Sequence, residues 1–326
     1  MTLAYSSRLL YLSLAAFFLV QVSASAAAWL LIPAALRRAS QVAPRSGARL
    51  LFTLRVAPTA LSLLLVAALC VPSYLWLEPE QSVEEAGVIC SVAALLAAAV
   101  WSASIARVLR AVARSFQYRA RCRRGGTQVH LEGQSAPVWV IDDAKGALAL
   151  AGILRPQLFI SRRVLTQLTA DQLSVVMRHE DAHRSSGDNL KRLFLLLSPD
   201  ILPFFHGFAR LEKNWARLTE WAADDHAVDG DTGRSLSLAS ALVRVARLGP
   251  VSYPSPIITS CLDDECDLAA RVDRLLMPPP AVASSKVRTP LSATVAAGGL
   301  TALLVAVMLH PGTLHSVHSL LEYLIR

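Results

Sequence analysis

The chain has 326 residues, of which 54% are hydrophobic and 17% are charged, and its mean hydropathy is +0.44. This composition is too apolar for an ordinary soluble domain, so it predicts a membrane protein. The net charge of +8 is compatible with anionic lipid, nucleic acid or a topology signal, and the positions of the charges must decide among these.

Charge-free runs near the N-terminus are each long enough to cross a bilayer, which takes about 20 apolar residues. We predict transmembrane helices over residues 9–36, 56–77 and 86–106. A fourth span is predicted over residues 291–309. The apolar stretch Leu193–Phe205 is shorter and contains two prolines, so we expect a buried or interfacial segment there instead of a span.

The charges between these runs predict the side of the membrane on which each loop lies. Arginines follow the first and third runs, whereas the loop after the second run is acidic. The positive-inside rule therefore places the first and third loops in the cytoplasm and both termini outside. The alternative, a cleaved signal peptide over residues 8–26, would leave the arginine-rich loop outside. The basic charge is then a topology signal, and we expect no direct binding of nucleic acid.

The fold class predicted from these spans is an α-helical membrane protein with four transmembrane helices. Residues 1–107 form three of them, residues 108–288 form an inserted cytoplasmic α+β domain, and residues 289–326 form the fourth span and a short outer tail. The five cysteines include no CxxC pair, so neither a cysteine zinc knuckle nor a disulfide framework is predicted.

Short strands and longer helices are predicted inside the cytoplasmic domain. The strands lie within residues 137–142 and 148–161, and Pro156 confines the second stretch to a sheet edge or a bulge. A capping-box pattern predicts a helix that starts at Thr169 and runs through His183. Two further helices are predicted over Glu212–Val228 and Asp267–Leu276.

An HExxH motif, His179 to His183, lies on the first of these helices. Residues four apart share one helix face, so both imidazoles can bind one metal ion. Zinc favours imidazole and carboxylate ligands, and a catalytic zinc site has three protein ligands and a water molecule. Glu180 is suited to take the proton from that water and pass it to the leaving amine. Because the motif also arises by chance, a third ligand is required to support this interpretation.

Glu220 and Asp224 lie one turn apart on the second predicted helix. We predict that Glu220 is the third zinc ligand and that Asp224 holds a ligand histidine by its other ring nitrogen. The alternative, a solvated helix face, suits Asp225 better because it points elsewhere on the helix. Glu220 must also lie on the same side of the membrane as His179, which is satisfied when no span separates them.

The segments HEDAHRSSGD (179–188) and LTEWAAD (218–224) resemble the BlaR/MecR family of membrane zinc metallopeptidases. The segments ALAGILRPQLFIS and LPFFHGFARLEKNWARL are also similar to that family, as is the predicted order of spans and domain. The resemblance implies that zinc is bound by His179, His183 and Glu220, and that Glu180 is catalytic. The HxxxxD spacing adds Asp188 beside the ligands.

One position and the C-terminal region depart from the family pattern. Ala223 stands where family members often have a cysteine, next to the aspartate and not at a ligand. The antibiotic sensors of the family carry a large penicillin-binding domain after the fourth span, whereas this chain has a tail from His310 to Arg326. We therefore expect the peptidase without the β-lactam sensor.

The function predicted from the sequence is a zinc-dependent endopeptidase that cleaves a cytoplasmic or membrane-proximal protein, such as a transcriptional repressor. An edge strand near Leu158 is expected to take the substrate as an added strand. A quality-control or prenyl-protein peptidase of the HtpX type is an alternative with the same motifs. A non-catalytic membrane signalling scaffold is a second alternative. The sequence predicts neither the substrate, nor the activating signal, nor the oligomeric state.

Overall fold

The computed structural model describes residues 3–77, 87–129, 137–142, 148–200, 207–248, 255–258 and 265–277, together with 310–313, 315–316 and 319. The predicted fourth span over residues 291–309 lies outside these described residues. The described part is mostly helical and contains a small mixed sheet. The strands are β1 (Gly126–Val129), β2 (Val138–Ile141), β3 (Leu148–Ala151) and β4 (Gln157–Ser161). The helices are α1 (Leu3–Ser40), α2 (Pro44–Leu65), the π-helix η1 (Val66–Cys70), α3 (Val71–Leu77), α4 (Val88–Gly125), α5 (Arg162–Gln167), α6 (Ala170–Ser186), α7 (Asp188–Leu197), α8 (Gly207–Val228), α9 (Thr232–Ala246) and α10 (Glu265–Leu276).

Three helical stretches near the N-terminus are long and apolar enough to cross a membrane, namely Tyr5–Ser40, Pro44–Leu77 and Val88–Gly125. They contain the first two predicted spans and the third from residue 88 onward, which supports membrane association. Helix α4 has 38 residues and is therefore about 57 Å long, whereas the hydrocarbon core of a bilayer is about 30 Å thick. With no Gly or Pro between residues 107 and 124, α4 continues unbroken past the predicted domain boundary at residue 107.

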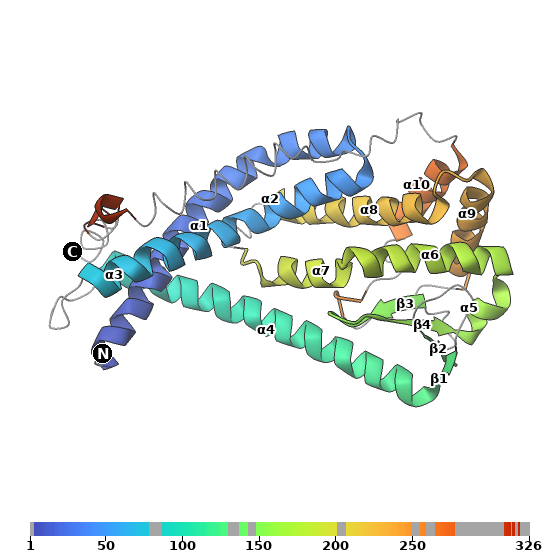
Figure 1. The fold of residues 1–326 in the computed structure, drawn as a ribbon, viewed down its shortest axis with the longest axis horizontal. Coiled ribbons are helices and arrows are strands. Elements are labelled where there is room, and N and C mark those ends of the chain that lie inside the picture. Colours follow the sequence, from blue (N-terminus) through green and yellow to red (C-terminus); the bar gives the residue numbers. More distant parts are fainter. Residues whose placement is uncertain are drawn as a thin grey trace.

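The long helices meet at one end of the molecule and spread apart at the other (Figure 1). Tyr5, Tyr74 and Cys90 pack together at the narrow end, from α1, α3 and α4. The turn between α1 and α2 and the C-terminal end of α4 lie at the wide end (Figure 1). Helices α6, α7 and α8 and the sheet lie between these long helices, with α8 against the α1–α2 hairpin and α4 beside the sheet, and α5, α9 and α10 lie at the wide end.

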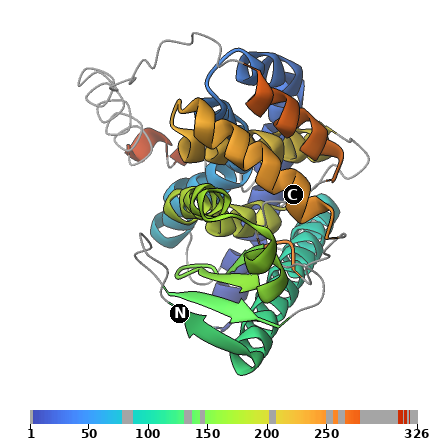
Figure 2. The ribbon, with the colours of Figure 1, turned by 90° about the vertical axis from the view of Figure 1, so that its right-hand side faces the viewer.

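The sheet has the strand order β1-β2-β4-β3, in which β2 and β4 are parallel and the other pairs are antiparallel. Side chains alternate between its two faces. Val138 and Leu158 point to the core that the sheet shares with α6, whereas Phe159 packs on the other face with Cys122 of α4. The sheet therefore lies between α6 and α4, as seen from the wide end in Figure 2.

The prediction of an edge strand near Leu158 is wrong. Leu158 belongs to β4, which has β2 on one side and β3 on the other. Pro156 directly precedes β4, so its missing N–H group lies outside the ladder and imposes no edge position. At the edge strand β3, the Leu150 and Gly152 carbonyls accept hydrogen bonds from Asn189 Nδ2 at 3.0 and 2.6 Å. Addition of a substrate strand at Leu158 is therefore excluded.

The helices between residues 162 and 276 follow their sequence signals closely. The capping box at Thr169 is formed, and α6 extends beyond His183 to Ser186. Helix α7 ends at Leu197 and has 10 residues, so the stretch from Leu193 forms no span within the described residues. Strand β1 and helix α9 were not predicted, because β1 is short and polar and no motif marks α9.

Candidate metal centre

Helices α6 and α8 bring His179, His183 and Glu220 together in the interior of the domain. The two histidines have the i, i+4 spacing of one helix face, and Glu220 approaches them from α8. All three side chains are buried, and one potential ligand atom from each lies within 4.8 Å of the others. This buried group could hold a metal ion.

The separations among the three ligand atoms fit a single ion. The Nε2 atoms of His179 and His183 are 3.1 Å apart. Each Nε2 atom is 3.5 Å from a carboxylate oxygen of Glu220. Two ligands bound at about 2.0–2.1 Å to a tetrahedral ion lie about 3.3–3.4 Å apart. The described geometry therefore needs shifts of only a few tenths of an ångström to coordinate an ion.

The outer nitrogen of each imidazole faces a carboxylate. His179 Nδ1 lies 3.0 Å from Asp224 Oδ1, and His183 Nδ1 lies 2.8 Å from Asp188 Oδ2. A carboxylate only accepts hydrogen bonds, so both Nδ1 atoms carry the proton and a neutral ring then has a lone pair on Nε2. Two nitrogen lone pairs and the carboxylate of Glu220 consequently point at one another. Such an arrangement requires a positive charge between them.

The electrostatics of the metal-free site show the same requirement for a positive charge. Burial by itself lowers the pKa of His183, but the charge of Glu220 and the hydrogen bond to Asp188 raise it to about 9. Burial opposes ionisation of Glu220 as well, and His183 and Arg271 nevertheless hold its pKa well below the usual range. Without metal, a proton on His183 therefore supplies the charge that an ion would otherwise provide.

Asp188 reaches His183 because the chain bends sharply between α6 and α7. Gly187 ends α6 in the left-handed conformation, with φ of 67°, and is followed at once by α7. This turn brings the first residue of α7 back against the last turn of α6. The second oxygen of Asp188 binds Lys191 Nζ at 2.7 Å, which fixes the carboxylate further. Asp188 therefore orients His183 from outside the ligand set, where the HxxxxD spacing placed it.

Arg271 belongs to the centre and was missed by the sequence analysis. Its guanidinium contacts both oxygens of Asp224, at 2.6 and 2.9 Å, and lies 3.0 Å from Glu220 Oε2. Burial alone raises the pKa of Asp224, but the charge of Arg271 and the hydrogen bond from His179 lower it to about 2. The sequence did indicate that Arg271 is buried, because it occupies the apolar stripe of α10 between Leu268 and Val272.

Glu180 lies beside the candidate ligands in the interior of the domain. Its side chain is buried, and neither carboxylate oxygen makes a hydrogen bond to any of the described residues. Burial raises the pKa of Glu180, while the nearby His179 and His183 oppose that effect. A desolvated carboxylate without donors is a stronger base than a solvated one, and it is free to accept a proton from water.

The structure thus places the six predicted site residues in one centre, and it leaves Asp225 outside, where Asp225 pairs with Arg274 at 2.6 Å on the exposed side of α8. No protein family, curated protein or solved structure matches this chain in the comparisons with known proteins.

Proposed function

We propose that this chain is an integral membrane zinc endopeptidase of the BlaR/MecR type. The observation that carries the proposal is the convergence of three potential ligand atoms from His179, His183 and Glu220. Beside them lies the carboxylate of Glu180, which makes no hydrogen bond to the part of the chain that the structure describes. A purely structural zinc site uses all four positions and does not need a buried base beside it.

Zinc is the ion that suits this set of two imidazoles and one carboxylate. Bound there, it would polarise the scissile carbonyl and lower the pKa of a water molecule to about 7. The chain supplies the rest of the chemistry. Asp224 and Asp188 hold the two imidazoles in the coordinating tautomer, and Arg271 holds Asp224. Glu180 accepts the proton of the attacking water and returns it to the departing amine.

The proposed topology places this centre in the cytoplasm. The α1–α2 turn and the C-terminal end of α4, both rich in arginine, lie at the wide end of the molecule, as do α6 and the sheet (Figure 1). The positive-inside rule assigns that end to the cytoplasm. A fourth span over residues 291–309 would return the chain to the outside. The substrate would then be a cytoplasmic or membrane-proximal protein, such as a transcriptional repressor.

The proposal is tested with the full-length protein purified in detergent. We expect about one zinc ion per chain in the wild type, loss of zinc in His183→Ala, and retention of zinc in Glu180→Gln. Cleavage of unfolded casein should fall by about 10²–10⁴-fold in Glu180→Gln, because general acid–base catalysis contributes that much. Asp225→Asn is the matched control, since its side chain faces away from the centre, and it should match the wild type in both assays.

Two results would overturn the proposal. Zinc content that is unchanged in His183→Ala would contradict the assigned ligands. Stoichiometric zinc with no cleavage of any protein would favour a signalling scaffold. If cleavage depends on Glu180, proteins trapped by the Glu180→Gln form would separate a regulatory protease, with one dominant substrate, from an HtpX-type quality-control protease with many.

A further inference from the structure

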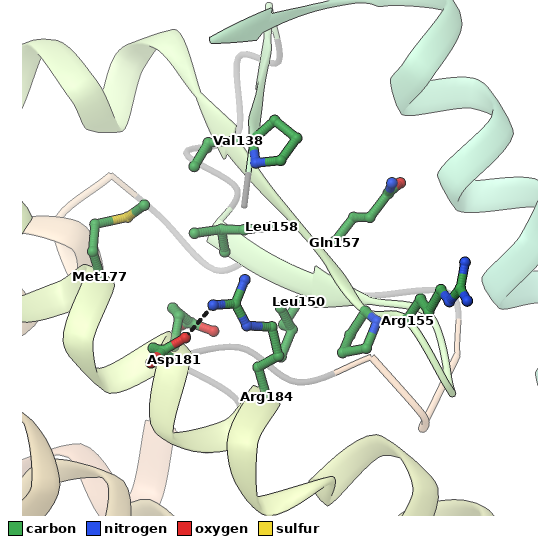
Figure 3. Close-up of a pocket in the computed structure, with 11 residues that line it drawn as sticks. Val138, Leu150, Arg155, Gln157, Leu158, Met177, Asp181 and Arg184 are labelled. Atoms are coloured by element: carbon green, nitrogen blue, oxygen red, sulfur yellow. Dashed lines mark hydrogen bonds and ion pairs between the residues drawn. The ribbon is translucent and has the colours of Figure 1, made fainter. Parts of the chain in front are cut away.

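A hollow of about 190 Å³ lies between the face of the sheet and helix α6, and Glu180 forms part of its lining. The floor is made by Val138 of β2, Leu150 of β3 and Leu158 of β4. Met177 closes it from α6, one turn before Glu180. Figure 3 shows the strand side chains on one side of the hollow and the side chains of α6 facing them.

The position of these side chains follows from strand periodicity and pairing. Leu150 and Leu158 are directly paired across the β3–β4 ladder. They therefore project from the same face of the sheet, which is the face that packs on α6. The floor is consequently apolar and held by three adjacent strands.

The rim of the hollow is polar and its charges are mostly compensated. Arg184 pairs with Asp181 one turn away on α6, and its guanidinium lies between the helix and the strands (Figure 3). Arg155 is exposed at the opposite side of the rim. The rim therefore carries two arginines, Arg155 and Arg184, and two carboxylates, Glu180 and Asp181, and favours neither sign of charge. The floor offers a charged group no partner, so burial of a charge there is costly.

The volume of the hollow limits what it can hold. An engineered apolar cavity of about 150 Å³ takes one benzene molecule. The hollow beside Glu180 is slightly larger, so it has room for one aromatic or large aliphatic side chain. It has no room for a folded segment of chain.

We propose that this hollow is the specificity pocket of the peptidase and takes a bulky apolar side chain of the substrate, such as Phe, Leu or Met, next to the scissile bond. The inference rests on the proposed function, because it requires a peptide bond to lie at the metal centre. Glu180 borders both the centre and the hollow, so a carbonyl placed at the ligands leaves the neighbouring side chain within reach of the floor.

The first test is cleavage of a diverse peptide library by the zinc-loaded, full-length protein, with the cut sites read by mass spectrometry. We expect Phe, Leu or Met at one fixed position beside the cut bond. Met177→Ala enlarges the hollow and should shift the preference toward Trp. Leu158→Phe fills it and should reduce cleavage after bulky residues by about tenfold or more relative to Ala. Leu173→Ala, a similar truncation on α6 that does not line the hollow, is the control.

The second test uses binding, so that the pocket and the peptidase can fail separately. Fluorescent peptides that differ only in one central residue (Phe, Ala, Lys or Asp) are titrated into zinc-loaded Glu180→Gln protein. We expect the Phe peptide to bind at least about tenfold more tightly than the Ala peptide, with the difference lost in a Leu158→Phe background.

Preferential binding of the Phe peptide without any cleavage by the wild type would support the pocket and overturn the peptidase. Cleavage that ignores the neighbouring residue, or that keeps its preference in both pocket variants, would overturn the pocket and leave the peptidase standing. A preference for Lys or Asp would overturn the apolar assignment. Thermal unfolding of each variant identifies any that fail to fold, and Met177→Ala and Leu158→Phe provide independent routes to the same conclusion.

Discussion

Arg271 supplies a permanent positive charge to the buried carboxylates of the candidate metal centre. It is buried between Glu220 and Asp224 and contacts both carboxylates. A buried carboxylate that loses its only permanent partner is strongly destabilising. In the zinc-bound protein the ion would neutralise Glu220 as well. Arg271 should therefore contribute most to the stability of the metal-free protein.

We predict that Arg271→Ala lowers the stability of the metal-free protein by about 3–5 kcal/mol, because it leaves two buried carboxylates without a guanidinium. The loss should be smaller in the zinc-loaded protein. Arg274→Ala removes a pair on the exposed side of α8 and should cost only about 0–1 kcal/mol. Thermal unfolding in detergent, with and without zinc, measures both. Equal losses for the two variants would contradict the buried role of Arg271.

The grouping of the candidate ligands was predictable from the sequence, because each pair shares one helix face. His179 and His183 share a helix face by their spacing alone, and Glu220 and Asp224 do so on their own helix. Arg271 was not predictable in the same way, because it lies 47 residues from Asp224 on another helix. Only its position in the apolar stripe of α10 distinguished Arg271 from the other arginines of the chain.

Among the elements, the junction of α6 and α7 positions the site most directly. Gly187 adopts a left-handed conformation there, and a Cβ atom at this position would meet no neighbouring atom within 4 Å. Glycine is therefore favoured by the left-handed backbone conformation and not by a lack of room for a side chain. The bend places Asp188 against His183, so a distorted turn would displace the imidazole of His183, a candidate metal ligand.

We predict that Gly187→Ala lowers stability by about 1–2 kcal/mol, the cost of a left-handed L-residue, and weakens zinc binding by about 10–100-fold through Asp188. Gly230→Ala is the matched control. Gly230 also has a positive φ, of 75°, and open space at its Cβ, but it lies beyond the end of α8. It should lose similar stability and keep its zinc affinity, measured by competition with a chelator. Equal zinc affinities for the two variants would argue against this role of the turn.

On the scale of the whole molecule, Arg55 joins a long apolar helix to the helices around the candidate metal centre. This arginine lies on α2 and is buried. Its Nε donates to Glu212 Oε1 at 2.6 Å, and its Nη2 donates to the Ser198 carbonyl at 3.2 Å. The guanidinium also lies 5.0 Å from the centre of the Phe208 ring. One side chain therefore connects α2 to the helix that carries Glu220 and to the end of α7.

We predict that Arg55→Ala destabilises the protein by about 1.5–3 kcal/mol, because hydrogen bonds to a buried charged group are lost. Arg55→Lys should recover only part of this, since an ammonium cannot make the same forked contacts. Arg49→Ala, on an exposed position of the same helix, should be nearly neutral. Thermal unfolding in detergent compares the three variants. A neutral Arg55→Ala would show that apolar packing alone holds α2 against α8.

The amino-acid sequence was sufficient for features that depend on neighbours along the chain. Three apolar runs, the capping box at Thr169 and the i, i+4 motifs are properties of single helices, so they could be recognised before the fold was known. The placement of β4 inside the sheet, the contact of Arg271 with Glu220 and the hollow beside Glu180 required the structure. Each of these depends on segments that are distant in sequence and meet only through packing, and periodicity within one segment carries no information about that partner.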